Sequence, residues 1–284
     1  MQILSRAVGL TALAAVTACA HAINYPSTTG PRYVGEPATP RTVERREHPN
    51  ELRVVTFNDE DAVHVDSTIR LLQTAAPLAG ADVITLQEMD APATRQIADA
   101  LGMYYVYYPA SIARNHRDFG EAVLSRWPII DDEKVILPHL GRFDKSQRIA
   151  TGVTILVDSV PVRVYSMHLG TFVDVGAGSK RDQARAILAA ADSYPRVVIA
   201  GDANSHDVGQ TFQDAGYVWI TRHNRSTVHW WNWDHVFARG LEPAAHADTR
   251  TGVEDARGAS DHRPVWALFT FQREEPAVKE RASR

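Results

Sequence analysis

The chain has 284 residues, of which 44% are hydrophobic and 23% are charged. These fractions are ordinary for a globular protein and exclude a disordered chain, a fibre and a polytopic membrane protein. With 30 basic against 34 acidic residues, the formal net charge of −4 excludes binding to nucleic acid by bulk charge and leaves only a local basic groove open. The single cysteine excludes an internal disulfide bond and a cysteine-based zinc site.

The N-terminal segment has the features of an export signal. Its apolar run, Ala7–Ala18, is too short to span a bilayer and is typical of a signal-peptide core. Cys19 directly follows Val16-Thr17-Ala18, and this run resembles the lipobox of bacterial lipoproteins, where cleavage precedes a cysteine that becomes lipid-modified. We therefore expect a signal peptide over residues 1–18, lipid attachment at Cys19 and a place in the bacterial cell envelope. The alternative is ordinary cleavage shortly after Cys19, which gives a periplasmic or secreted protein.

Composition separates a linker and a tail from the folded part. Residues 19–50 contain five prolines and little apolar periodicity, so we expect a Pro-rich tether that holds the domain off the membrane. Residues 272–284 are rich in charge and are expected to be a solvated tail. Between them, residues 51–271 show no internal repeat or second linker and predict one domain, which we expect to be monomeric.

Nine apolar runs predict strands. Several are continuous and β-branched, as expected for strands that are buried on both faces of a sheet. Two of them follow each other without a helix and indicate a hairpin. The predicted strands are Leu52–Phe57, Asp82–Leu86, Met103–Tyr108, Ala122–Ser125, Ile149–Val157, Val162–Met167, Arg196–Ala200, Trp233–Phe237 and Pro264–Phe271.

Three helices are predicted among these strands. One helix is predicted to begin at Ser179, where a Ser-x-x-Asp motif resembles a capping box. Apolar residues at helical spacing follow it. Asp66 is predicted to cap a second helix that ends near Pro77, and a third runs from Pro92 until Gly102 stops it. Because some neighbouring strands lack an intervening helix, the pattern predicts an α/β protein with mixed sheets rather than strict alternation.

Polar side chains stand where several predicted strands end. Asn58, Glu88 and His168 each follow an apolar run directly. Asp202 ends another such run, with Asn204 two residues on, and Ser260-Asp261-His262 precedes the last strand. Each case alone is compatible with a capped turn or a solvated loop. Five together indicate a site at one rim of a sheet, where sites are normally built.

The chemistry of these side chains is coherent. Glu88, Asp261, Asn58 and Glu60 offer hard oxygen ligands without a nearby thiolate, a set that suits Mg²⁺, Mn²⁺ or Ca²⁺ better than zinc. Because Asp59 also follows Asn58, the sequence leaves open which of the two acids helps to hold a metal.

A second group of residues suits acid–base work and anion binding. Asp202 and Asn204 project the same way on an extended chain, so one can orient a water while the other holds a phosphate oxygen. Asp234 or the neighbouring Asp261 would orient the imidazole of His262, and Arg148 is suited to phosphate oxygens.

The order of these motifs resembles the endonuclease/exonuclease/phosphatase superfamily, whose members share the deoxyribonuclease I-like fold. The resemblance covers about residues 51–271 and implies a four-layer αββα sandwich of two packed mixed β-sheets flanked by helices. The matching blocks are LRVVTFN, DVITLQE, GEAVLSRWPI, QRIATGV, VRVYSMHL, VVIAGDAN, WDHVF and SDHRPV.

The resemblance also implies roles. Glu88 would be the principal metal ligand, with Asn58, Glu60 and Asp261 near the metal. Asp202 would orient or deprotonate the attacking water, and Asn204 would bind the phosphate. His262 would stabilise charge or move a proton while Asp234 fixes its ring, and Arg148 and His168 would complete the phosphate pocket. The implied reaction is metal-assisted, in-line attack of water on phosphorus.

The substrate stays open at this point. Abasic-site repair enzymes of the superfamily carry a tyrosine where this chain has His168, which argues against DNA repair. A nuclease needs a basic groove, for which Arg114, Arg117, Arg142 and Lys145 are candidates. A lipid phosphodiesterase needs an exposed apolar loop, for which Trp230 and Trp231 are candidates.

The expected partner is thus a phosphate ester, taken from nucleic acid, a lipid or inositol head group, or a small phosphodiester. The non-enzyme alternative is a catalytically silent envelope scaffold. The presence of a suitable residue at every expected catalytic position argues against it.

Overall fold

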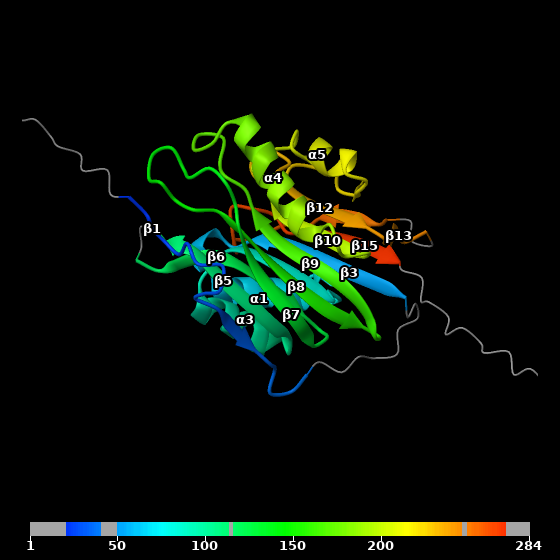
Figure 1. The fold of residues 1–284 in the computed structure, drawn as a ribbon. Coiled ribbons are helices and arrows are strands. Elements are labelled where there is room, and N and C mark those ends of the chain that lie inside the picture. Colours follow the sequence, from blue (N-terminus) through cyan, green and yellow to red (C-terminus); the bar gives the residue numbers. More distant parts are fainter. Residues whose placement is uncertain (1–20, 41–49, 114–115, 246–248, 271–284) are drawn as a thin grey trace, which may run out of the picture.

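The computed structural model describes residues 21–40, 50–113, 116–245 and 249–270. Two mixed β-sheets pack face to face, with helices on the outside of each (Figure 1). Helices α4 and α5 cover one sheet, and α1 and α3 lie on the opposite side of the molecule. The expected four-layer sandwich of two mixed sheets is confirmed.

The first sheet has nine strands in the order β1-β5-β6-β4-β3-β15-β13, with β2 paired to β5 and β14 paired to β15. All its pairs are antiparallel except β3 with β4. Its strands are β1 (Ile23–Asn24), β2 (Tyr33–Gly35), β3 (Glu51–Asn58), β4 (Val83–Met89), β5 (Tyr104–Ile112), β6 (Asp118–Ser125), β13 (Glu242–Pro243), β14 (Thr251–Val253) and β15 (Val265–Thr270).

The second sheet has six strands in the order β11-β12-β10-β9-β8-β7, and only β9 and β10 run parallel. Its strands are β7 (Ile129–Ile136), β8 (Ile149–Val157), β9 (Val160–His168), β10 (Val197–Asp202), β11 (Val218–Trp219) and β12 (Asp234–Arg239).

Five α-helices and one 3₁₀ helix connect the strands of the described chain. They are η1 (Glu60–Ala62), α1 (Val65–Thr74), α2 (Ala76–Ala79), α3 (Ala91–Leu101), α4 (Ala177–Ala191) and α5 (Gly209–Asp214). Asp90 caps α3 by accepting from the backbone N–H of Ala93, and Gly102 ends it in the left-handed conformation, as predicted. None of the helices in the described part of the chain is long and apolar enough to cross a bilayer.

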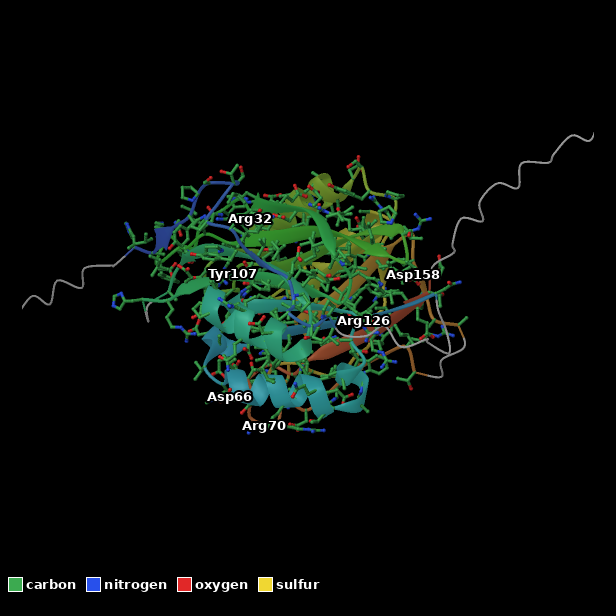
Figure 2. All side chains as sticks on the ribbon, turned by 90° about the horizontal axis from the view of Figure 1, so that it is seen from below. Arg32, Asp66, Arg70, Tyr107, Arg126 and Asp158 are labelled. Atoms are coloured by element: carbon green, nitrogen blue, oxygen red, sulfur yellow. The ribbon has the colours of Figure 1, made fainter. Side chains whose placement is uncertain are left out.

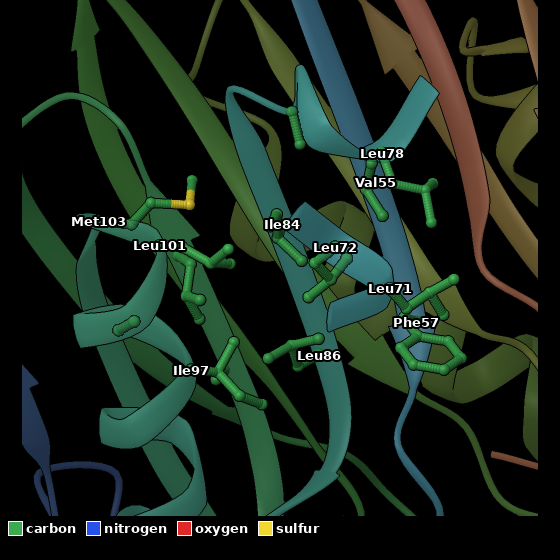
Figure 3. Close-up of a cluster of buried hydrophobic side chains, with 14 of the residues drawn as sticks. Val55, Phe57, Leu71, Leu72, Leu78, Ile84, Leu86, Ile97, Leu101 and Met103 are labelled. Carbon is green, nitrogen blue, oxygen red and sulfur yellow. The ribbon is translucent and has the colours of Figure 1, made fainter. Parts of the chain in front are cut away.

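Three apolar clusters hold the layers together. One lies between the two sheets and draws side chains such as Val54, Val153 and Val198 from both of them. A second lies under α1 and α3, where Leu72 and Ile97 meet Ile84 and other residues of the first sheet (Figure 3). The third lies under α4 and α5. Because apolar burial is the main favourable term in folding, the first cluster holds the two sheets together and the other two hold the helices on them.

The described part of the expected tether is not a free linker. The N-terminal arm, defined as residues 21–35, adds β1 and β2 to the edge of β5. Arg32 forms an ion pair with Asp132 on the second sheet, and the ring of Tyr33 lies 5.8 Å from that of Tyr107. Figure 2 shows Arg32 and Tyr107 on the same side of the molecule. The prediction failed because aromatic and backbone hydrogen-bonding contacts outweigh the bias of the scattered prolines.

Three further expectations needed correction. Strand β7 was missed because its Asp-Asp-Glu-Lys centre belongs to an edge strand whose side chains are partly exposed. Ser179 does not cap α4, which begins at Ala177 after Gly176. Asp66 lies in the first turn of α1 and not at its cap. The cleavage site, Cys19 and the tail 272–284 fall outside the described residues.

The strand registers bring the functional side chains to one rim. In the parallel pair β9–β10, His168 stands opposite Asp202, and in the antiparallel pair β10–β12, Asp202 stands opposite Asp234. In the first sheet, Asn58 stands opposite Gln87, which places Glu88 just beyond it. The ends of both sheets therefore present polar groups at the same edge.

Gly201 gives the first test of this arrangement. Its φ of +150° is one that L side chains rarely adopt, and a Cβ there would lie 1.9 Å from the carbonyl oxygen of Met167. Gly201→Ala should therefore separate β9 from β10 next to His168 and Asp202 and lower the free energy of unfolding by at least about 2 kcal/mol in urea denaturation.

Gly178→Ala is the matched control, because a Cβ there meets only a side-chain end of Arg181 at 4.0 Å. An alanine in this exposed helical position should leave stability unchanged or raise it slightly. Equal stabilities for the two variants would contradict the role given to Gly201.

Candidate active site

The two sheets meet at the side chain of Asn58. Its Nδ2 atom donates to Glu88 Oε1 at 3.0 Å and to Asp202 Oδ2 at 3.2 Å, so one buried amide joins a carboxylate of each sheet. Its Oδ1 atom accepts from the backbone N–H of Glu60 at 3.1 Å. Asn58 thus holds the two carboxylates in place, and its role as a metal ligand stays a prediction.

A β-bulge directs Glu88 into the site. The register of β4 against β6 shifts between Leu86 and Met89, and Glu88 has a φ of 59°. Such bulges and left-handed residues concentrate where a side chain must be re-aimed. Burial raises the pKa of Glu88, although the hydrogen bond from Asn58 and the charge of Arg148 oppose the shift.

The structure separates the two acids that follow Asn58. Asp59 is fully buried and accepts a hydrogen bond from the hydroxyl of Thr68 in α1, so it faces the helix layer. Burial raises its pKa to about 7, against the effect of that hydrogen bond. Glu60 is exposed at the rim, where its Oε2 atom accepts from the backbone N–H of Asp261 at 3.0 Å. Of the two, Glu60 is the one whose carboxylate lies at the exposed rim, beside Asp261.

Asp202 is held by Asn204 from both sides of its carboxylate. The backbone N–H of Asn204 donates to Oδ1 at 2.7 Å and its side-chain Nδ2 donates to Oδ2 at 3.2 Å. The same amide donates to the carbonyl of Leu169, and the buried Lys180 donates to the carbonyl of Asn204 at 2.6 Å. Asn204 therefore orients Asp202. Burial, together with the charge of Asp234, raises the pKa of Asp202 to about 7.

His262 and Asp234 form a buried pair. The Nδ1 atom of His262 donates to Asp234 Oδ2 at 2.9 Å, and its Nε2 atom lies 3.8 Å from Asp202 Oδ2. Ser260 supports the loop, because its hydroxyl accepts from the backbone N–H of His262 and donates to the carbonyl of Asn58. Burial opposes a charge on His262, but the carboxylates of Asp234, Asp202 and Asp261 outweigh it and raise its pKa to about 10.

Ligand-type atoms of Asp202, Asp234 and His262 all lie within 4.8 Å of one another. A metal would need the neutral imidazole as a ligand, whereas the carboxylates of Asp234, Asp202 and Asp261 favour the charged form of His262 and raise its pKa to about 10. We therefore interpret this cluster as an acid–base set. The oxygen donors that suit Mg²⁺, Mn²⁺ or Ca²⁺ are the carboxylates of Glu88 and Glu60, with the exposed Asp261 beside them.

Arg148 and His168 form the other wall of the site. The Nη1 atom of Arg148 lies 3.0 Å from both ring nitrogens of His168. His168 Nε2 is 3.5 Å from Asp202 Oδ2, which connects this wall to the acid–base set. Burial, followed by the charges of Arg148 and His262, lowers the pKa of His168 well below its usual value, so its ring is neutral.

Glu121 lies behind this wall. It is fully buried, neither carboxylate oxygen has a hydrogen-bond partner, and Oε1 is 3.7 Å from His168 Nδ1. Burial raises its pKa well above its usual value, although Arg148 and Lys134 oppose this. Glu121 therefore does not line the open part of the site, where its charge would repel a second phosphate.

Three of the four residues proposed for a nucleic-acid groove lie in the described part of the chain. Arg117 forms an ion pair with Asp90 and donates to the carbonyl of Asp61. Lys145 Nζ donates to the carbonyl of Arg142, and both residues are exposed. Arg114 lies outside the described residues. A basic groove for a nucleic-acid backbone therefore stays a prediction.

The tryptophans form an exposed aromatic surface beside Asn204. The rings of Trp231 and Trp233 stack at 5.6 Å, while Trp230 is 79% exposed and Trp231 is 47% exposed. Trp231, Trp233 and Lys180 line a cavity of about 370 Å³ that reaches Asn204. The side chain of Trp233 is half-buried.

Sequence analysis missed three contributors to the site. Lys180 in the first turns of α4 supports Asn204, a contact that the sequence pattern did not indicate. Ser260 was noted only as part of a motif. The backbone N–H of Asp61 donates to Glu88 Oε2 at 3.3 Å, a contact that no side-chain pattern signals.

Glu121 gives a test by pH dependence. A carboxyl group whose pKa is raised on folding keeps its proton in the folded state, so its contribution to stability falls as the pH rises above its unfolded pKa of about 4.3. Glu121→Gln removes this loss. The variant should match the wild type near pH 4 and gain on it by up to about 1.4 kcal/mol per pH unit above that.

Urea denaturation at several pH values measures the difference, with the exposed Glu36→Gln as a control for the loss of one acid. A variant that loses stability relative to wild type as the pH rises would show that Glu121 is held as a carboxylate.

Comparison with known proteins agrees with this geometry. Residues 57–262 match the sequence model of the Endonuclease/Exonuclease/phosphatase family. No curated protein sequence matches the chain.

Solved structures show the same fold at low identity. An endonuclease/exonuclease/phosphatase from Beutenbergia cavernae DSM 12333 is 21% identical, with a TM-score of 0.64 over 78% of this chain and 72% of its own. D. rerio TDP2 complexed with single-strand DNA product is 16% identical, with a TM-score of 0.59 over 78% and 99% of the two chains.

The mannosyl-6-phosphatase of Bacteroides thetaiotaomicron VPI-5482 is also 16% identical, with a TM-score of 0.57 over 78% of this chain and 100% of its own. Members of the matched family are hydrolases of phosphate esters that depend on a divalent metal. On the match over residues 57–262, the chain belongs to the endonuclease/exonuclease/phosphatase family.

Proposed function

We propose that the protein is a divalent-metal-dependent phosphodiesterase. The proposal rests on one observation: two chemically different groups of side chains lie together at one edge of the two sheets. The acid–base set of Asp202, Asp234 and His262 comes from the second sheet and the last loop, and the carboxylates of Glu88 and Glu60 come from the first. Asn58 joins the two sets by its hydrogen bonds to Asp202 and Glu88.

A divalent ion fits the carboxylates on the first sheet. Glu88 and Glu60 would hold it, with Asp261 nearby, and the ion would neutralise negative charge that builds on the phosphate oxygens. The donor set consists of hard oxygens, and the raised pKa of Glu88 indicates a carboxylate that gains from a nearby cation.

The residues of the second sheet supply the proton chemistry. Asp202, oriented by Asn204, takes a proton from the attacking water, and its pKa of about 7 suits a general base at neutral pH. His262, charged and fixed by Asp234, stabilises the developing charge on the phosphate. Arg148 binds a phosphate oxygen, and the neutral His168 completes that wall.

We favour a diester as the substrate. Arg148 and the charged His262 can pair with a phosphate monoanion, and a divalent ion at Glu88 and Glu60 would add to their charge. The structural neighbours do not indicate which alcohol is esterified to the phosphate of the substrate. One neighbour is complexed with single-strand DNA product and another is a mannosyl-6-phosphatase. A nuclease and a lipid or inositol phosphate phosphoesterase remain the alternatives.

The experiment compares purified wild type with Asp202→Ala and His262→Ala in Mg²⁺, Mn²⁺ or EDTA. The substrates are bis(p-nitrophenyl) phosphate, supercoiled plasmid, sphingomyelin and an inositol polyphosphate. We expect turnover that EDTA abolishes and that each variant lowers by about 10²- to 10⁴-fold, because removal of a general base or charged acid costs that much.

Asp192→Ala, an exposed acid near the opposite end of β10, is the matched control and should keep the wild-type rate. Equal rates for wild type and Asp202→Ala would exclude this mechanism. A protein that turns over no substrate of the panel while binding no metal would instead favour the envelope scaffold.

We further propose that the enzyme works in the bacterial envelope, anchored through Cys19. The lipobox-like run before this cysteine supports the proposal. Mass spectrometry of the protein from bacterial membranes should show an acylated N-terminal Cys19. Cys19→Ser should move the protein to the soluble fraction, and an unmodified mature N-terminus would contradict the anchor.

A further inference from the structure

The N-terminal arm forms one wall of a pocket next to the phosphate site. The pocket has a volume of about 500 Å³ and lies between β1, the end of β5, the start of β6 and the loop before β8. Its lining includes Ile23, Ile112, Phe119, Asp61, Asp144 and Arg148. No role in the reaction proposed above has been given to this space.

The pocket is continuous with the candidate active site through Arg148. The guanidinium group of Arg148 is 3.0 Å from His168 on one side and 5.1 Å from the ring centre of Phe119 on the other. Asp61, which also lines the pocket, donates its backbone N–H to Glu88. A phosphate held by Arg148 would therefore place one of its ester substituents in this pocket.

The lining indicates what kind of substituent fits. Ile23, Ile112 and Phe119 give it apolar and aromatic walls. Asp61 and Asp144 disfavour a second negative charge, and Arg148 is engaged by the phosphate itself. The other polar side chains of the lining are His21, Ser111, His116 and Ser146. An uncharged apolar or aromatic group thus gains more in this pocket than a sugar phosphate or a second phosphoryl group.

The arm also holds the loop that carries Arg148. The backbone N–H of Ala22 donates to the carbonyl of Asp144 at 2.7 Å. Asn24 donates to the carbonyl of Lys145 at 2.7 Å and accepts from the backbone N–H of Gln147 at 2.9 Å. These contacts connect the arm to the residues directly before Arg148.

We propose that this pocket is the specificity site for one alcohol substituent of the phosphodiester, that it takes an uncharged apolar or aromatic group, and that the N-terminal arm completes it. The proposal rests on the proposed function, because the phosphate held at Arg148 fixes where the substituent lies.

The test measures inhibition of bis(p-nitrophenyl) phosphate hydrolysis by phenylphosphonate and by methylphosphonate. The wild type should bind phenylphosphonate at least about tenfold more tightly, since an apolar pocket gains that much from even small hydrophobic groups. Ile23→Ser should lose most of this preference while the affinity for methylphosphonate and kcat stay unchanged. Ile23 is 63% exposed, so the substitution leaves folding intact.

Two variants complete the experiment. Ile130→Ser, the same substitution at a 56% exposed position on β7 outside the pocket, should retain the wild-type preference. Trp231→Ala, in the cavity on the Asn204 side, should also retain it. Loss of the preference in Trp231→Ala but not in Ile23→Ser would overturn the proposal and place the substituent in the other cavity.

The outcomes separate the two proposals. A wild type that hydrolyses diesters but shows the same preference as Ile23→Ser would refute the pocket assignment alone. A wild type that hydrolyses no diester and binds neither phosphonate with Mg²⁺ or Mn²⁺ would refute the proposed function and the assignment with it.

Discussion

The site depends on one buried amide between two carboxylates. Asn58 donates to Glu88 within its own sheet and to Asp202 across the sandwich, and both bonds require the two sheets to keep a fixed position. A second polar bridge runs deeper in the same interface, where Gln87 donates to Ser166. Buried polar groups are costly unless they are satisfied, so a small sliding of one sheet over the other would leave these groups unpaired. Apolar packing holds the layers together, and this polar bridge fixes how their functional edges align.

The same rim concentrates negative charge, and several of its carboxylates are buried. Burial raises the pKa of Glu88, Asp59 and Asp202, which means that the fold disfavours several carboxylates in their ionised form. Beside Asp202 and Asp234, the raised pKa of His262 favours a positive charge that balances these carboxylates. On the side of Glu88, Arg148 supplies a balancing charge, and a divalent cation held there would supply more. The electrostatics therefore give a physical reason why a family of this fold depends on a divalent metal.

Much of this arrangement was predictable because polar residues stood at the ends of apolar strands. His168, Asp202 and Asp234 meet as expected, since parallel and antiparallel registers bring these strand ends together. The sequence could not choose between Asp59 and Glu60, because only the packing of α1 with its Thr68 hydroxyl turns Asp59 inward. It also could not place Glu121, whose burial depends on the contact between the two sheets, or the arm, whose pairing with β5 is a long-range contact. Local patterns thus recovered the strands and most site residues but not the contacts between distant segments.

The pairing of the arm with β5 has a consequence for how the protein behaves in a crowded compartment. Strand β5 contains no charged side chain, and its neighbour on one side is β6. Without β1 and β2, its other side would be an apolar free edge interrupted only by Pro109, a surface on which strands of other copies readily pair. The arm occupies that edge with the chain's own backbone. The segment that precedes the domain in the sequence therefore also protects it against aggregation through β5.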